Sequence, residues 1–270
     1  MGRIVAIHSL RGGTGKSNLT ANLACAVAAR GHRVGVIDTD IASPGIHVLF
    51  GVDESKLAYT LNDYLWGTCP IEKAAVALPD TFVSLAAPGA AAGALYLVPA
   101  SIDTGEIARI LHDGYDVGLL NDGILSLINH FKLDYVFVDT HPGVNEETLL
   151  SIAISDFTLL ILRPDQQDFQ GTAVTVELAR QLEVKNMMLV VNKAHSATDK
   201  AALKRLVEEK LQTPVGEIIM LSDDMVQFGS GGLYCVQFPG HAYSEAVGRI
   251  AELLTSTLSA SEGAADRTYA

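Results

Sequence analysis

The stretch IVAIHSLRGGTGKS, residues 4–17, decides the fold. It joins an apolar run at residues 4–9 to a glycine-rich loop, and the residues that follow carry apolar side chains at helical spacing. Leu19, Leu23 and Val27 fall on one face of a helix predicted over residues 17–30, and Gly31 occupies the position at which a glycine often ends a helix. A buried strand, a glycine loop and a helix in this order indicate the first unit of an α/β domain.

The same alternation continues along the chain. Short apolar runs predict strands at residues 4–9, 34–37, 95–98, 135–138, 157–162 and 187–191. Helical spacing predicts further helices at residues 106–112, 118–131, 146–154, 172–182, 198–211 and 244–258. Strands that are apolar throughout need cover on both faces. We therefore expect an α/β fold with a doubly wound, mainly parallel sheet and helices on both faces.

The domain organisation follows from the absence of a linker or a charge block within the sequence. We predict one domain over residues 1–258 and a disordered tail over residues 259–270, which are small and polar. The stretches 70–80 and 222–239 give no clear pattern. The segment between Asp80 and Asp103 carries no charged residue, but prolines and glycines interrupt it, so we expect no membrane span.

The composition excludes several classes of protein. The 270 residues are 49% hydrophobic and 19% charged, which provides a core and argues against disorder. The 19 Lys and Arg against 31 Asp and Glu give a formal net charge of −12, so binding to DNA would require a local basic patch. Cys25, Cys69 and Cys235 are widely spaced, which argues against a disulfide framework and fits the cytoplasm.

The glycine loop has the residues of a phosphate-binding site. Small residues let successive backbone N–H groups face phosphate oxygens, and the start of the helix adds partial positive charge. In this arrangement Lys16 reaches the β- and γ-phosphates and the Ser17 hydroxyl binds Mg²⁺. The residues predicted to bind the nucleotide are Gly12, Gly13, Thr14, Gly15, Lys16, Ser17 and Asn18.

Two features of the loop leave alternatives open. The usual pattern has a glycine where this chain has Leu10, so the loop departs from the strict motif. A dinucleotide fingerprint is the rival interpretation, but only two of its three glycines are present, and Lys16 follows where a small residue is required. A plain glycine-rich turn with a solvated lysine is the remaining alternative.

The segment RGGTGKS, residues 11–17, resembles the deviant Walker A motif of the MinD/ParA family of partitioning and positioning ATPases. The runs at residues 36–40, 97–101 and 137–140 follow in the order of that family. The resemblance implies a P-loop NTPase fold, the cofactors ATP and Mg²⁺, and a sandwich homodimer. In that dimer the residue at Arg11, normally a lysine, crosses to the nucleotide of the other subunit. A surface arginine beside the loop is the alternative for Arg11.

The same resemblance assigns roles to three carboxylates. It implies that Asp40 orients the attacking water, with Lys16 and Arg11 as further catalytic groups, and that Asp38 and Asp139 join Ser17 around the metal. An acidic helix N-cap is the alternative for residues 38–40. Residues 140–143 would sense the γ-phosphate, and the family often has a small residue or proline where this chain has His141.

The sequence also indicates the base. Residues 192–195 resemble the guanine-reading motif of GTPases, but His195 replaces its aspartate. Guanine then lacks its matched acceptor, which favours adenine, and the resemblance implies that Asn192 contacts the adenine edge. A turn asparagine at the end of a strand is the alternative for Asn192.

The family resemblance implies a slow, partner-stimulated ATPase that uses ATP-driven dimerisation to position or partition a cellular cargo, such as a chromosome, a plasmid or a division or motility apparatus. The alternative is a nucleotide-binding regulatory module that recruits partners with little or no hydrolysis. An iron–sulfur carrier ranks last, because the cysteines offer no paired ligands.

The partners implied are a second copy of the chain and an unidentified stimulating or cargo protein. Residues 165–171 are either a partner contact or a plain loop. Non-specific DNA binding would use Lys200, Lys204 and Arg205, although Glu208 and Glu209 favour an ordinary solvated helix face. The C-terminal tail lacks the apolar and basic faces of a membrane anchor.

Overall fold

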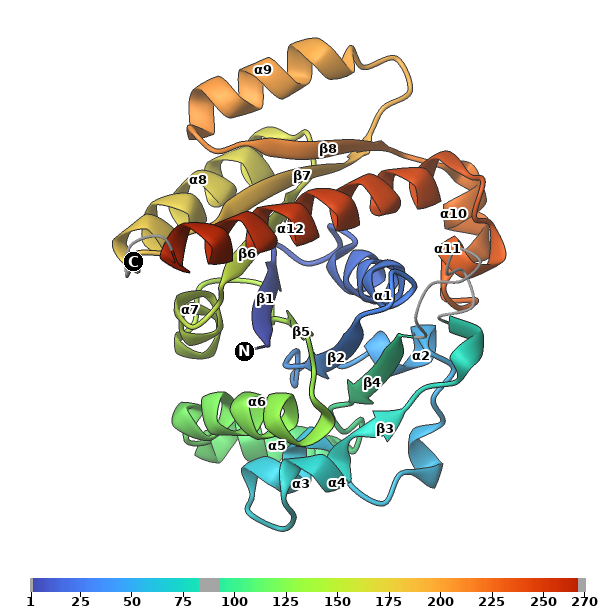
Figure 1. Ribbon diagram of the computed structural model, residues 1–270, viewed down its shortest axis with the longest axis vertical. Helices are drawn as coiled ribbons and strands as arrows, with labels where there is room; N and C mark the ends of the chain where they lie inside the picture. Colours follow the sequence, from blue (N-terminus) through green and yellow to red (C-terminus); the bar gives the residue numbers. More distant parts are fainter. Residues whose placement is uncertain (1, 83–92, 267–270) are drawn as a thin grey trace.

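The fold is an eight-stranded sheet with the strand order β3-β4-β2-β5-β1-β6-β7-β8. The computed structural model describes residues 2–82 and 93–266, with side chains to residue 260. All neighbouring strands pair in parallel except β3 and β4, which are antiparallel. The predicted doubly wound, mainly parallel sheet is therefore confirmed (Figure 1). The strands are β1 (Arg3–His8), β2 (Arg33–Asp38), β3 (Val76–Ala77), β4 (Ala94–Val98), β5 (Tyr135–Asp139), β6 (Phe157–Leu162), β7 (Met187–Ala194) and β8 (Val215–Met220).

Helices cover both faces of this sheet (Figure 1). The α-helices are α1 (Lys16–Ala28), α2 (Ile46–Leu49), α3 (Leu61–Leu65), α4 (Ile71–Ala74), α5 (Thr104–Asp113), α6 (Val117–Phe131), α7 (Glu146–Ala153), α8 (Gln166–Gln181), α9 (Lys200–Leu211), α10 (Asp223–Phe228), α11 (Tyr234–Gln237) and α12 (Ala242–Asp266). Two short 3₁₀ helices lie at Glu54–Lys56 and Asp80–Phe82.

The alternation of side chains along β5 divides the core into two layers. Phe137 packs with Leu23 of α1 and Ile250 of α12 in one cluster. Its neighbours Val136 and Val138 pack with Ile124 of α6 on the opposite face. Because both faces are buried, β5 consists of fully buried residues, which is the pattern that predicted it.

Several helices begin at a side chain that caps their backbone N–H groups. Asp103, Asp116, Asn145, Asp165 and Asp199 each accept hydrogen bonds from the first turn of α5, α6, α7, α8 and α9. The cap at Asp165 starts α8 earlier than residue 172, the predicted start. Residues 166–171 are therefore the first turns of a helix, and the expectation of a plain loop there is wrong.

In the first half of the chain, α2, α3, α4 and β3 were not predicted, and the last two lie in the stretch 70–80 that gives no clear pattern. Other differences lie in the second half of the chain. Strand β8 was not predicted, and the stretch 222–239 contains α10 and α11. Helix α12 continues to Asp266, past the domain boundary predicted at residue 258. Residues 267–270 of the predicted tail, and residues 83–92 of the uncharged segment, lie outside the described residues. Within the described ranges, no helix is long and apolar enough to cross a bilayer.

Candidate nucleotide-binding site

The glycine loop lies between β1 and α1 at the carboxyl edge of the sheet. Gly13 and Gly15 have φ angles of 76° and 92°, a left-handed backbone that glycine adopts without steric cost. A Cβ atom on Gly15 would lie 2.6 Å from Nδ2 of Asn192, so a larger residue does not fit there. The loop therefore makes a tight turn directly before a helix N-terminus, which is the arrangement that binds phosphate oxygens.

Leu10 occupies the position at which the usual motif has a glycine. Its side chain lies against Gly171 in α8, where an added Cβ would collide with the Leu10 side chain. The glycine on the neighbouring helix makes room for the leucine on the loop. The departure from the motif is thus accommodated by packing outside the loop backbone.

Lys16 extends from this loop to two of the predicted carboxylates. Its Nζ lies 2.9 Å from Oδ1 of Asp139 and 3.7 Å from Oδ2 of Asp40. The Thr20 hydroxyl also donates to Oδ1 of Asp139, at 2.9 Å. Oδ2 of Asp139 is buried and has no hydrogen-bond partner among the described residues. A buried carboxylate oxygen left unpaired fits a magnesium ion, which prefers oxygen ligands, and the half-buried Ser17 directly follows Lys16 in the chain.

Asp38 lies beside Asp139 because the two are register partners in the β2–β5 pair. Both oxygens of Asp38 accept backbone N–H groups, from Asp40 at 3.1 Å and from Gly45 at 3.3 Å. Burial, and then the charge of Asp139, raise the pKa of Asp38 to about 7. In this structure Asp38 holds the loop that follows β2, and its role as a metal ligand stays a prediction.

The described side chains do not make a complete metal site by themselves. Across residues 2–82 and 93–260, no group of three or more His, Cys, Asp or Glu side chains is arranged to hold a metal ion. Magnesium usually keeps several waters and binds one or two carboxylates together with substrate phosphates. Asp139 and Ser17 stay the predicted protein ligands for that mode of binding.

Asp40 is the second carboxylate near the ammonium group of Lys16. The Ser43 hydroxyl donates to Oδ1 of Asp40 at 2.9 Å, and Nε2 of His141 lies 3.8 Å from the same oxygen. The Asp40 side chain is 10% exposed, so it is mostly enclosed but still reaches the surface of the site. A carboxylate in this position can accept a hydrogen bond from a water beside a γ-phosphate.

Asn192 of strand β7 stabilises the glycine loop through a hydrogen bond. It lies within β7, not after it, and its Nδ2 donates to the carbonyl of Thr14 at 2.8 Å. Lys193, with a φ of 59°, donates from Nζ to the carbonyl of Gly13 at 2.7 Å. A cavity of about 300 Å³ opens beside this contact, lined by the predicted residues Gly15, Asn18 and Asn192 and by Met220, Leu221, Ser222, Met225 and Val226.

Arg11 is the predicted site residue that lies apart from these groups. Its guanidinium contacts Gln167 and lies 3.7 Å from Oδ1 of Asp168 through Nε, both on α8. Asp168 is 2% exposed and is also held by Arg163. Gly12 and Gly13 are exposed on the same side of the loop.

Three polar residues of the site were not predicted. Thr20 and Ser43 bond to Asp139 and Asp40, and their positions carry no motif. His8 is fully buried at the end of β1, and its Nδ1 lies 2.8 Å from Oγ1 of Thr140. Thr140 donates its hydroxyl to the carbonyl of Ile7, so His8 must be the donor of the first bond. Burial, Lys16 and His141 lower the pKa of His8 to about 3, which keeps the imidazole neutral.

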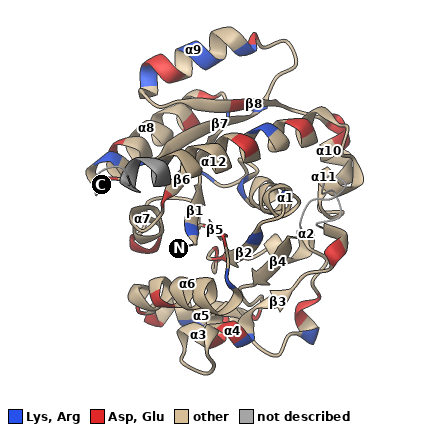
Figure 2. Cartoon of the chain, in the orientation of Figure 1, with Lys and Arg blue, Asp and Glu red and all other residues tan. Residues whose placement is uncertain are grey.

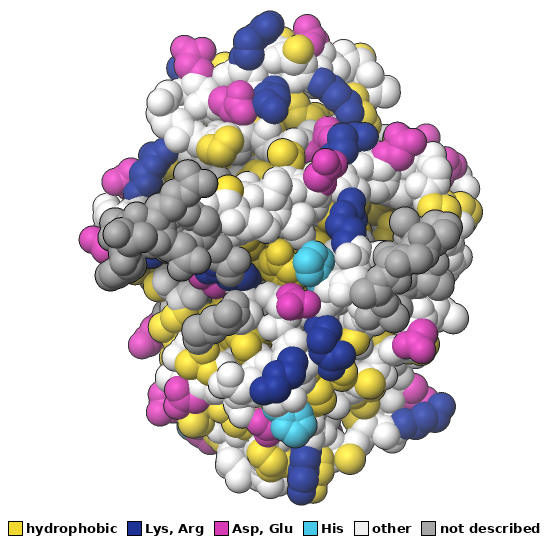
Figure 3. All heavy atoms as spheres, viewed as in Figure 1, with side chains coloured by type: hydrophobic (Ala, Val, Ile, Leu, Met, Phe, Trp, Pro, Cys, Tyr) yellow, Lys and Arg dark blue, Asp and Glu magenta, His cyan; other side chains and the backbone are white. Residues whose placement is uncertain are grey.

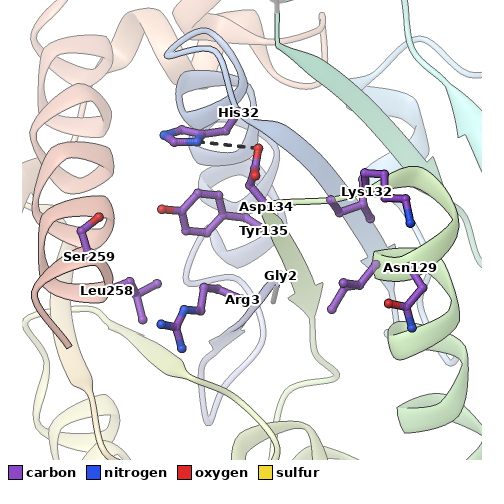
Figure 4. Close-up of a pocket in the computed structure, with 11 residues that line it drawn as sticks. Gly2, Arg3, His32, Asn129, Lys132, Asp134, Tyr135, Leu258 and Ser259 are labelled. Atoms are coloured by element: carbon purple, nitrogen blue, oxygen red, sulfur yellow. Dashed lines mark ion pairs between the residues drawn. The ribbon is translucent and has the colours of Figure 1, made fainter. Parts of the chain in front are cut away.

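Another cavity lies at the opposite end of the sheet and contains none of the predicted residues (Figure 4). It has a volume of about 490 Å³. His32 pairs with Asp134 on one side, whereas Lys132 and Asn129 lie on the α6 side (Figure 4). Its polar groups do not converge on one point, and the loop edge remains the candidate site.

The sheet topology together with the strand–glycine loop–helix unit and Lys16 defines a P-loop NTPase. Residues 1–85 match the family model ParA, described as "NUBPL iron-transfer P-loop NTPase". The chain is 25% identical to an uncharacterized ATP-binding protein of Methanocaldococcus jannaschii over 78% of its own length and 71% of that protein. It is 28% identical to the septum site-determining protein MinD of Bacillus subtilis over 72% of its own length and 65% of that protein.

Solved structures agree with this match in fold. The cell division ATPase MinD of Pyrococcus furiosus has a TM-score of 0.79 with 23% identity, covering 95% of this chain and 100% of that one. MinD of Pyrococcus horikoshii, solved with Mg-ADP, has a TM-score of 0.77 with 20% identity, covering 94% and 96%. These matches support the resemblance of the chain to the MinD/ParA family of P-loop ATPases that its deviant Walker A loop predicted.

Proposed function

We propose that the chain is an Mg²⁺-dependent ATPase in which ATP controls the association of two copies. One observation carries the proposal: Lys16 Nζ lies 2.9 Å from Asp139 and 3.7 Å from Asp40, directly beside the glycine loop. A phosphate-binding lysine, a metal-binding carboxylate and a water-orienting carboxylate thus converge on one point. Phosphoryl transfer depends on such positioning and charge stabilisation.

Adenosine triphosphate is the nucleotide that the site favours. The cavity beside Asn192 adjoins the loop and is large enough for a base. His195, which stands where guanine readers have an aspartate, is exposed. The relatives support the same choice, since their names include an ATP-binding protein and a cell division ATPase.

Each site residue then has a role in hydrolysis. Ser17 and Asp139 would hold Mg²⁺, and the ion would supply positive charge against the phosphates. Lys16 leaves its carboxylate partners for the phosphates, and Asp40 aligns the attacking water. Asp38 keeps the loop of Asp40 in place through the N–H groups of Asp40 and Gly45.

Dimerisation gives Arg11 its role. Its side chain is 42% exposed, and its guanidinium has polar contacts only with side chains of α8 among the described residues, so it can leave them for a phosphate of the partner copy. The ATP-bound dimer would then recruit a stimulating protein and position or partition a cargo. The relative of Bacillus subtilis carries the name of a septum site-determining protein, which supports this class of function.

A decisive experiment combines two measurements. Light scattering coupled to size-exclusion chromatography, with ATP and Mg²⁺, would compare wild type, Arg11→Ala and Asp40→Ala, and phosphate release would be followed in parallel. We expect a dimer for wild type and Asp40→Ala, a monomer for Arg11→Ala, and turnover for wild type alone. Wild-type protein that binds ATP without measurable turnover would instead support the regulatory module.

The distribution of charge bears on the surface on which a dimer would act. Lys204 pairs with Glu208 at 3.9 Å, and α9 carries both basic and acidic residues (Figure 2). On the face seen in Figure 3, the described Lys and Arg side chains are scattered among acidic ones. A protein partner is therefore favoured over DNA. An iron–sulfur carrier is not proposed, because Cys25, Cys69 and Cys235 are all buried.

A further inference from the structure

The pairing of β2 with β5 brings His141 next to Asp40. Asp38 and Asp139 are register partners, and the backbone N–H of Thr39 donates to the carbonyl of Asp139 at 3.0 Å. Asp40 and His141 each follow their register residue by two positions. Their side chains meet beyond the ends of the strands, with Nε2 of His141 3.8 Å from Oδ1 of Asp40.

The contacts of the imidazole fix which nitrogen carries a proton. Nδ1 of His141 lies 2.6 Å from the carbonyl oxygen of Pro142, which can only accept, so Nδ1 is assigned as the donor. With a proton on Nδ1 only, the ring presents the lone pair of Nε2 toward Asp40. The Thr148 hydroxyl holds the loop by donating to the carbonyl of His141 at 3.2 Å.

The separation of 3.8 Å is too long for a direct hydrogen bond between Nε2 and Oδ1. Two acceptors at this distance can instead each accept one hydrogen of a single water molecule. The His141 side chain is 33% exposed, which gives water a route to this position. The two acceptors would turn the lone pairs of that water away from themselves, toward a phosphate held at the loop.

We propose that His141 is a further catalytic residue, which shares with Asp40 the binding and orientation of the attacking water. The inference rests on the proposed ATPase function. The water oxygen bonds to the γ-phosphorus while the bond from that phosphorus to the bridging oxygen breaks, and ADP leaves with the electron pair. One hydrogen of the water stays on the phosphate product, and the other leaves as a proton through the acceptor pair to solvent.

Three substitutions test the assignment at the level of single atoms. His141→Gln places an amide oxygen near the position of Nε2, His141→Asn places its amide near Nδ1, and His141→Ala removes both. We expect kcat for ATP hydrolysis to fall about tenfold to a hundredfold in the Ala and Asn variants, with KM for ATP unchanged. The Gln variant should retain kcat within about threefold of wild type. Thermal unfolding and binding of a fluorescent ATP analogue would show that all variants are folded.

The outcomes separate this inference from the proposed function. If Asp40→Ala abolishes turnover but His141→Ala hydrolyses ATP as fast as wild type, the inference is wrong and the ATPase stands. Equal losses of kcat in all three His141 variants, or a raised KM, would show a structural loop residue and also overturn it. If wild type itself shows no turnover, the proposed function fails and the inference fails with it.

Discussion

Arg11 of the glycine loop and Asp168 of α8 lie 3.7 Å apart within one monomer. Asp168 accepts three hydrogen bonds from Arg163, at 2.9–3.0 Å, and does not depend on Arg11 to neutralise its charge. These contacts, with the three bonds from Arg163 as a main cause, lower the pKa of the Asp168 carboxyl despite its burial. The ion pair between Arg163 and Asp168 therefore stays intact when Arg11 moves away from Asp168.

The first prediction concerns Arg11. Arg11→Ala should lose ATP-dependent dimerisation while the monomer keeps its stability within about 1 kcal/mol, because a partly exposed ion pair contributes little. Arg11→Lys, which restores the residue usual in the family, should dimerise. Light scattering with ATP and Mg²⁺ measures the first effect, and urea unfolding the second. Dimerisation of the Ala variant at wild-type concentrations would contradict the proposed contact across the dimer.

The second prediction concerns the buried pair of Lys16 and Asp139. Asp139→Ala should lower the free energy of unfolding by about 3–5 kcal/mol, because it leaves the lysine charge buried without its nearest partner. Asp139→Asn, which keeps the shape and an oxygen for Thr20, should cost less and still lose the Mg²⁺ dependence of ATP binding. Urea unfolding and calorimetric titrations with and without Mg²⁺ provide the measurements. Unchanged magnesium dependence in the Asn variant would exclude Asp139 as a ligand.

The third prediction concerns Asn192. Asn192→Ala removes the bond to the Thr14 carbonyl and part of the wall beside Gly15, and should weaken ATP binding about tenfold. Wild type should bind ATP in preference to GTP. Calorimetry with both nucleotides measures both effects. The matched control is Asn186→Ala at the amino end of β7, where the side chain donates to Asp156 away from the loop.

The fourth prediction is a dependence of stability on pH. His8 has a pKa of about 3 in the folded chain, compared with about 6.5 when unfolded, so only the unfolded state takes up a proton between these values. Stability from this residue is complete above pH 6.5 and decreases on acidification by at most about 1.4 kcal/mol per pH unit. Between pH 6.5 and pH 5, wild type should therefore lose about 2 kcal/mol more than His8→Asn, which keeps a donor for Thr140.

The control for that experiment is His112→Asn, since the His112 side chain is 89% exposed. Urea unfolding at both pH values compares the three proteins, and the His112 variant should follow wild type. If His8→Asn loses as much stability as wild type over this interval, His8 is not the residue responsible.

The first strand, the glycine loop and the first helix were predictable because their signals are local. The run at residues 4–17 combines apolar strand residues with glycines at φ angles that other residues avoid, and Gly31, which adopts a φ of 94° after α1, was recognised from its position. The carboxylates at the ends of β2 and β5 were predicted from the resemblance to the MinD/ParA family. Their pairing through the register of Asp38 with Asp139 is the tertiary consequence.

The elements that were missed depend on contacts far along the chain. Strand β8 carries Glu217 in its middle, and this charge is tolerated because Arg249 of α12 pairs with it. Residues 165–171 allowed a plain loop in the sequence analysis, whereas Gly171 lies in α8 and makes room for the Leu10 side chain. The wall of the cavity beside Asn192 comes from Met225 and Val226 of α10, in a stretch without a clear pattern. These contacts join residues that are far apart in the sequence, so local sequence patterns do not predict them.

The lysine bridge between Asp139 and Asp40 would have a consequence for the proposed exchange of nucleotide. If a bound cation left the site with the product, its positive charge would be replaced by the ammonium group of Lys16, which is already anchored in the loop. Lys16 would then compensate the charges of both carboxylates in the interior. In the proposed cycle, the chain would thus release and rebind nucleotide without leaving these two carboxylates without a cation.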